Sequence, residues 1–139
     1  MFLALAAVDL PSATPSREAS TSGAVQVVRD YYAAVSRHDY RRAYVIWHGK
    51  QSYRQFRDGY RRTARVKVVP LPPFHIEGAA GSLYADIPVK VDAQLLSGAH
   101  QHFVGSYTLR RINNVPGSTA AQRHWHIESA RLKQVPAGH

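Results

Sequence analysis

The hydrophobic pattern of this chain changes its period once, at about Thr63. Before that residue, apolar side chains recur every three or four positions, which is the spacing of a helix with one buried face. After it, they alternate with polar side chains, as in a strand with one buried face. Such a chain is predicted to fold as α+β, with three N-terminal helices packed on one face of a mostly antiparallel sheet.

Each of the three predicted helices has its own start signal. Ser22 and Asp39 can cap the first two, and Ser52 with Gln55 forms a capping-box pattern ahead of the third. The predicted buried stripes contain Val25, Val28, Tyr32, Val35, Tyr40, Ala43, Tyr44, Trp47, Tyr53, Phe56 and Tyr60.

The clearest predicted strand covers residues 83–95, and a turn at Ser97-Gly98 reverses it into a strand over residues 100–112. We expect Val89 to lie opposite Tyr107, because this register turns the apolar residues of both strands toward the helices. A last strand follows with Trp125 and Ile127.

Two further expectations concern the same hairpin. The register that pairs Val89 with Tyr107 also sets Asp86 opposite Arg110 as a cross-strand ion pair. Pro88 cannot donate a ladder hydrogen bond, so a bulge or a sheet edge is predicted at that position.

Composition narrows the function classes. The 139 residues, 45% of them hydrophobic, suit one domain with its own core. The absence of cysteine excludes disulfides and thiolate catalysis. The formal net charge of +9 favours anionic partners.

The chain divides into three segments. Residues 1–23 begin with an apolar run and continue rich in Ser, Thr, Pro and Ala, as in a signal-peptide remnant and disordered linker. The run is too short to span a membrane. We therefore expect a periplasmic or secreted protein, with a cytoplasmic one as the alternative. Residues 24–135 form the predicted domain, and residues 136–139 a tail.

Residues 24–135 resemble a small bacterial member of the nuclear transport factor 2-like superfamily. The resemblance rests on the opening Val27-Val28-Arg29-Asp30-Tyr31-Tyr32-Ala33-Ala34, on Asp39-Tyr40, and on Tyr107-Thr108-Leu109-Arg110 with Trp125-His126-Ile127. It implies a cystatin-like cone, in which a strongly bent sheet wraps around the first helix and leaves a pocket at its open end. It also implies a homodimer through the sheet. This scaffold carries enzymes, ligand binders and structural modules, so it predicts a fold rather than a function.

The predicted pocket favours binding over proton transfer. No carboxylate or imidazole falls on the predicted inner sheet face between Leu83 and Ile127, and an unperturbed tyrosine is a poor base at neutral pH. Asp30, on the first helix, is the alternative catalytic residue. The predicted pocket residues are Tyr32, Trp47, Phe56, Tyr60, Phe103, Tyr107 and Trp125.

No metal site or cofactor is predicted. His100 and His102 form one pair, and His124 and His126 another, but the hairpin register sets the pairs at opposite ends of a strand. Zinc needs three or four ligands together.

The third predicted helix turns Arg54, Arg57 and Arg61 toward solvent, where they could meet an anionic surface. No sequence-specific nucleic-acid motif accompanies them. The sequence thus favours a non-catalytic module of the bacterial cell envelope that binds a small hydrophobic molecule or a protein partner. Two alternatives stay open: an isomerase or polyketide-cyclase-like enzyme with a pocket acid–base residue, and an envelope assembly component with a basic surface.

Overall fold

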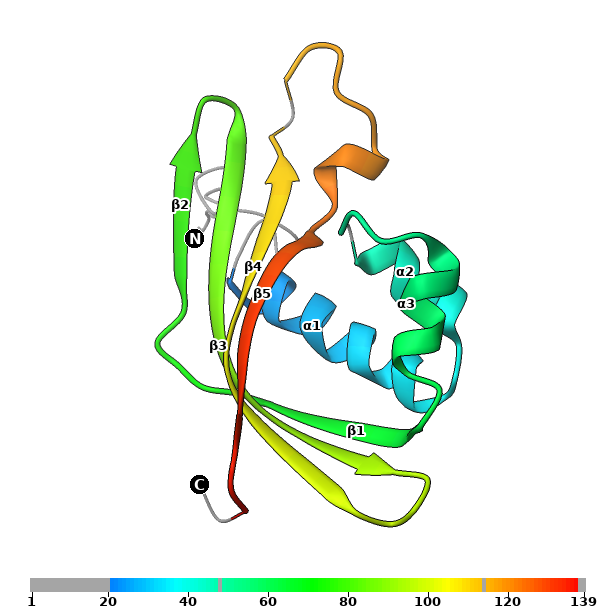
Figure 1. The fold of residues 1–139 in the computed structure, drawn as a ribbon. Helices are drawn as coiled ribbons and strands as arrows, with labels where there is room; N and C mark the ends of the chain where they lie inside the picture. Colours follow the sequence, from blue (N-terminus) through cyan, green and yellow to red (C-terminus); the bar gives the residue numbers. More distant parts are fainter. Residues whose placement is uncertain (1–20, 48, 114, 138–139) are drawn as a thin grey trace, which may run out of the picture.

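A computed structural model describes residues 21–47, 49–113 and 115–137. In this part of the chain, three helices precede a bent five-stranded sheet and lie together on its concave side (Figure 1). The predicted α+β architecture is confirmed. The predicted leader falls mostly on residues 1–20, which lie outside the described residues. No helix among the described residues is long and apolar enough to cross a membrane.

The helices are α1 (Thr21–Ser36), α2 (Tyr40–Ile46) and α3 (Tyr53–Gly59). The Asp39 carboxylate accepts a hydrogen bond of 3.2 Å from the Arg42 backbone N–H and caps α2. Ser52 and Gln55 exchange side-chain and backbone hydrogen bonds of 3.1 and 3.2 Å at the start of α3. The two caps predicted for α2 and α3 are therefore confirmed.

The sheet contains β1 (Thr63–Pro70), β2 (His75–Ala79), β3 (Ser82–Leu95), β4 (His100–Ile112) and β5 (His126–Val135), and a short 3-10 helix, η3 (Ala121–Arg123), precedes β5. The strand order is β1-β3-β4-β5, and β2 also pairs with β3. All of these pairings are antiparallel.

The hairpin of β3 and β4 keeps the predicted faces but not the predicted partners. Val89 and Tyr107 are both buried, yet Val89 pairs with Gly105 and Tyr107 pairs with Ile87. The prediction of direct Val89–Tyr107 pairing is therefore wrong by two residues. The predicted Asp86–Arg110 pair is wrong for the same reason, because Asp86 lies opposite Thr108.

The ladder between β3 and β4 runs through Pro88 without a bulge, but on the other side of β3 the proline lies at a local edge of the sheet, between the last β1 pair and the first β2 pair. The prediction of a bulge or an edge at this position is therefore confirmed. The Pro88 carbonyl accepts a 2.8 Å hydrogen bond from the Leu71 N–H, in the interval between the end of β1 at Pro70 and the start of β2 at His75. The missing N–H of Pro88 faces this interval, where no ladder partner requires it.

The core lies between α1 and the inner face of the sheet. Its largest fully buried side chains are Val28, Val35, Ile87, Val89, Leu109 and Ile127. The predicted apolar faces of the first helix and of the two long strands therefore meet in one core.

Candidate functional site

A cavity of about 240 Å³ opens on the inner side of the sheet, beside the end of α3. We call it the inner cavity. It is lined by Tyr32, Gly59, Tyr60, Thr63, Val66, Val91, Ala93, Gln101, Phe103 and Leu132. Three predicted pocket residues, Tyr32, Tyr60 and Phe103, are brought together here. None of the described lining residues carries a carboxylate or an imidazole.

Paired phenols extend from this cavity into the core. The Tyr31 and Tyr60 hydroxyls lie 2.7 Å apart, and the Tyr32 and Tyr107 hydroxyls form a second hydrogen bond. The Tyr31 and Tyr32 rings meet edge to face with centroids 5.0 Å apart. Tyr107 thus supports Tyr32 from behind, although it does not line the inner cavity.

Burial sets the protonation state of these phenols. It is the largest cause that raises the pKa of Tyr31 and Tyr32 well above 10, with a further rise from the neighbouring Tyr60 and Tyr107. Burial also raises the pKa of Tyr60 and of Tyr107. Near neutral pH, all four hydroxyls are protonated and exchange hydrogen bonds without acting as bases.

Three other predicted pocket residues lie elsewhere. Phe56 is 3% exposed and packs against the Tyr60 ring at a centroid distance of 5.5 Å, within the core. Trp47 follows α2 and forms an isolated bridge with Ile127. Trp125 is buried next to a different cavity. Phe56 therefore belongs to the core behind the inner cavity, and Trp47 and Trp125 lie outside that cavity.

That second cavity, of about 350 Å³, contains the alternative catalytic residue. Asp30 lines it together with Arg42, His124, Trp125 and His126. The Gln26 side-chain amide donates a 2.9 Å hydrogen bond to the Asp30 carboxylate. We call it the Asp30 cavity. Its lining carries a carboxylate and imidazoles, which the described lining of the inner cavity lacks.

The two histidine pairs lie toward opposite ends of β4, as predicted: His126 pairs with Arg110, and His102 pairs with Val135. The His100 ring nitrogen lies 3.0 Å from an Asp92 carboxylate oxygen, and His102 lies 3.8 Å from the same oxygen. Among the described residues, no group of three or more His, Asp and Glu side chains is arranged to hold a metal ion. Arg54, Arg57 and Arg61 are exposed on and just after α3.

The inner face of β4 carries a charged residue that the sequence reading did not consider. Tyr107, Leu109 and Arg111 point to the same face, and Arg111 is only 8% exposed. Every second residue from Phe103 to Leu109 faces inward, and continuing this alternation by two residues predicts that Arg111 faces inward as well.

Comparison with known proteins identifies the fold. No protein-family model and no curated protein matches the chain. A nuclear transport factor 2-like superfamily protein from Salmonella enterica serovar Typhimurium is similar in structure, with a TM-score of 0.57 and 11% identity over 85% of this chain and 93% of that one.

Two further solved structures agree. A protein from Streptomyces avermitilis, described as a candidate dehydratase of the same family, gives a TM-score of 0.55 at 14% identity and covers 89% of this chain and 100% of its own. A conserved protein from Planctomyces limnophilus gives 0.56 at 9% identity over 81% and 94%. Such low identities establish the fold alone. The chain therefore has the nuclear transport factor 2-like fold, as its helical opening and last two strands predicted.

Proposed function

We propose that this protein binds a small, mainly apolar molecule in the inner cavity without converting it chemically. The observation that carries the proposal is the lining, in which aliphatic and aromatic side chains surround a few polar groups, those of Tyr32, Tyr60, Thr63 and Gln101. Small-ligand sites have this makeup. The volume of about 240 Å³ is below the usual range of roughly 300–1,000 Å³, so the ligand is smaller than a drug-sized molecule.

The phenols would orient the ligand rather than react with it. Because burial raises the pKa values of Tyr32 and Tyr60, both hydroxyls stay neutral at physiological pH and can donate or accept a hydrogen bond. Proton abstraction needs a base whose pKa lies near the working pH. The described lining offers no such group.

The proposal is tested by filling the cavity. Isothermal titration calorimetry with 1-naphthol, an apolar molecule with one hydroxyl, should give saturable binding to the unmodified protein. Ala93 lines the cavity, so Ala93→Leu should weaken binding by about tenfold or more, which is at least about 1.4 kcal/mol. Ala33→Leu, an exposed position on α1, is the matched control and should bind like the unmodified protein. Equal affinities for the two variants would overturn the proposal.

The second candidate function is an isomerase or polyketide-cyclase-like enzyme that uses Asp30 as its acid–base group. It is favoured by one observation, the grouping of Asp30 with His124 and His126 around the Asp30 cavity. Asp30→Asn should leave 1-naphthol binding in the inner cavity unchanged. If the same variant abolished a measured turnover and kept its melting temperature, the enzymatic function would replace the binding function.

We also propose that the protein acts in the cell envelope, either as this binding module or as an assembly component. The proposal is supported by the apolar run in residues 2–8 and by the exposed Arg54, Arg57 and Arg61, whose charge suits an anionic polymer or partner. Cell fractionation after expression of the full chain tests the location. Recovery only with the cytoplasm would contradict it.

A further inference from the structure

Arg111 is charged, although the side chains next to it on the inner face of the sheet are mainly apolar. It follows Tyr107 and Leu109 on the inner face of β4 and lies opposite Leu83 of β3, which packs against the core. Its exposed fraction is 8%. Arginine is rarely buried to this extent unless its charge is paired.

Among the residues that the structure describes, none forms an ion pair with this guanidinium. Its Nε and Nη1 atoms are buried without a hydrogen-bond partner. Unlike a lysine or a histidine, arginine keeps its proton inside proteins, so it cannot escape the cost by becoming neutral. A buried charge without a partner is strongly destabilising, so this residue gains from any anion that reaches it.

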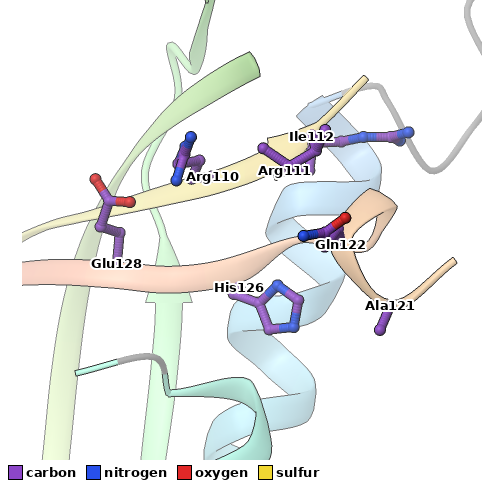
Figure 2. A pocket seen from close by; sticks show the side chains of 7 residues that line it. All are labelled: Arg110, Arg111, Ile112, Ala121, Gln122, His126 and Glu128. Atoms are coloured by element: carbon purple, nitrogen blue, oxygen red, sulfur yellow. The ribbon is translucent and has the colours of Figure 1, made fainter. Parts of the chain in front are cut away.

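Arg111 lines a cavity that could admit an anion. The cavity has a volume of about 360 Å³ and is lined by Arg110, Arg111, Ile112, Ala121, Gln122, His126 and Glu128 (Figure 2). Figure 2 shows Arg111 and Gln122 toward one side of this group, with Arg110 and Glu128 toward the other. We call it the Arg111 cavity.

The other polar residues of this cavity differ in what they can still bind. Arg110 donates a 3.1 Å hydrogen bond to the Ser82 hydroxyl and stands 5.8 Å from the centre of the Tyr84 ring, so it already has partners. The Gln122 carbonyl oxygen accepts a 2.9 Å hydrogen bond from the Thr119 N–H, and the Thr119 hydroxyl accepts from the Gln122 N–H at 3.2 Å. This reciprocal contact fixes Gln122 with its amide N–H groups as the remaining donors.

We propose that the Arg111 cavity binds a small oxyanion, the carboxylate or phosphate group of a metabolite-sized ligand, with Arg111 as the main charged contact and Gln122 as a neutral donor. Two arginines outweigh the single carboxylate of Glu128 in the lining, and guanidinium groups suit both carboxylate and phosphate oxygens. The site is separate from the inner cavity, which begins near Gln101 and Phe103 toward the other end of β4.

The direct test uses inorganic phosphate and succinate as probes, titrated separately into the full chain at constant ionic strength and followed by calorimetry. At least one of them should bind saturably, and the stronger of the two identifies the oxyanion class. Arg111→Gln should weaken that binding by about tenfold or more. Arg65→Gln removes the same charge at an exposed position of β1 and should bind within about twofold of the unmodified protein. Absent binding, equal losses in both variants, or equal competition by chloride would overturn the proposal.

Two further measurements keep the test decisive if Arg111→Gln does not fold. In the unmodified protein, the Nε–H resonance of Arg111 should shift on addition of the bound anion, and an unchanged resonance would contradict the assignment. Arg111→Met keeps the apolar stem and removes the unpaired charge, so without added anion its melting temperature should rise by roughly 3–6 °C. A fall would indicate a structural role for the charge and would also contradict the proposal.

Discussion

Among single residues, the buried tyrosines link the fold most directly to pH. Burial raises the pKa of Tyr31, Tyr32, Tyr60 and Tyr107 in the folded chain, whereas an unfolded tyrosine titrates near 10. Above that pH, the folded chain holds more protons than the unfolded chain. The stabilisation that these protonated tyrosines contribute is therefore complete below about pH 10. It is lost as pH rises through their pKa values in the folded chain.

We expect the free energy of unfolding to fall steeply above about pH 10, by up to roughly 1.4 kcal/mol per pH unit for each tyrosine that stays protonated only in the folded state. Tyr32→Phe removes one such proton, so its free energy of unfolding should decline less steeply with pH. Tyr84→Phe, a half-buried tyrosine on β3, is the control and should follow the unmodified protein. Urea titrations between pH 8 and pH 11.5 measure the three slopes, and identical slopes would contradict the assignment.

The sequence predicted the caps of α2 and α3 correctly, but the predicted cap of the first helix is wrong, because Ser22 lies inside α1. It did not predict the state of Arg111. A cap depends on hydrogen bonds within one turn, so Asp39 and Ser52 are readable from their own neighbourhoods. The lack of partners around Arg111 depends instead on segments far apart along the chain, such as β3 and η3. Its side of the sheet is predictable from the alternation of β4, but its unpaired state is not.

At the level of elements, the alternating pattern predicted which faces are buried but not which residues pair. A shift of two residues leaves every side chain on its own face, so the pattern of β3 and β4 fits both registers equally. The loop decides between them. Leu95 donates a 2.8 Å hydrogen bond to the Ala99 carbonyl, and Gly98 has a φ of 94°, which encloses Leu96, Ser97 and Gly98 in the loop.

The contact between β4 and β5 depends on one glycine. A Cβ at Gly105 would lie 1.8 Å from the Arg131 carbonyl oxygen and 2.9 Å from the Leu132 Cα, both of them backbone atoms. Gly105→Ala should therefore force the two strands apart and destabilise the protein by roughly 2–4 kcal/mol.

Gly59→Ala is the matched control, because a Cβ there meets nothing within 4 Å. It should leave the free energy of unfolding within about 1 kcal/mol of that of the unmodified protein. Denaturant titration of both variants measures the difference. Equal stabilities would show that β5 can shift to accept the methyl group.

For the whole molecule, the helices cover one face of the sheet and leave the other open (Figure 1). Across this open face, Val69 pairs with Lys90, Lys90 with Val104, and Val104 with Lys133. A homodimer through the sheet, which the family resemblance implies, would bring the lysines of both copies onto the same two-fold patch. Their repulsion would oppose the burial of Val69 and Val104.

Salt screens this repulsion, so dimerisation through the sheet should strengthen between about 20 mM and 500 mM sodium chloride. Lys90→Gln should strengthen it at low salt, whereas Lys50→Gln, exposed and outside the sheet, should not. Sedimentation velocity measures the association. A dimer that weakens with salt would require a different, charge-paired interface.

The first part of β3 pairs with β2 and its second part with β1. These two regions of the sheet should differ in local stability. β1 is fastened to α1, since the Ser36 hydroxyl both donates to and accepts from the Val66 backbone at 2.9 Å, whereas β2 is largely exposed. No ladder continues from one to the other past Pro88. β2 can therefore open as a low-energy cooperative unit while β1 and the core stay closed, and its amide protons would exchange with solvent long before those of β1.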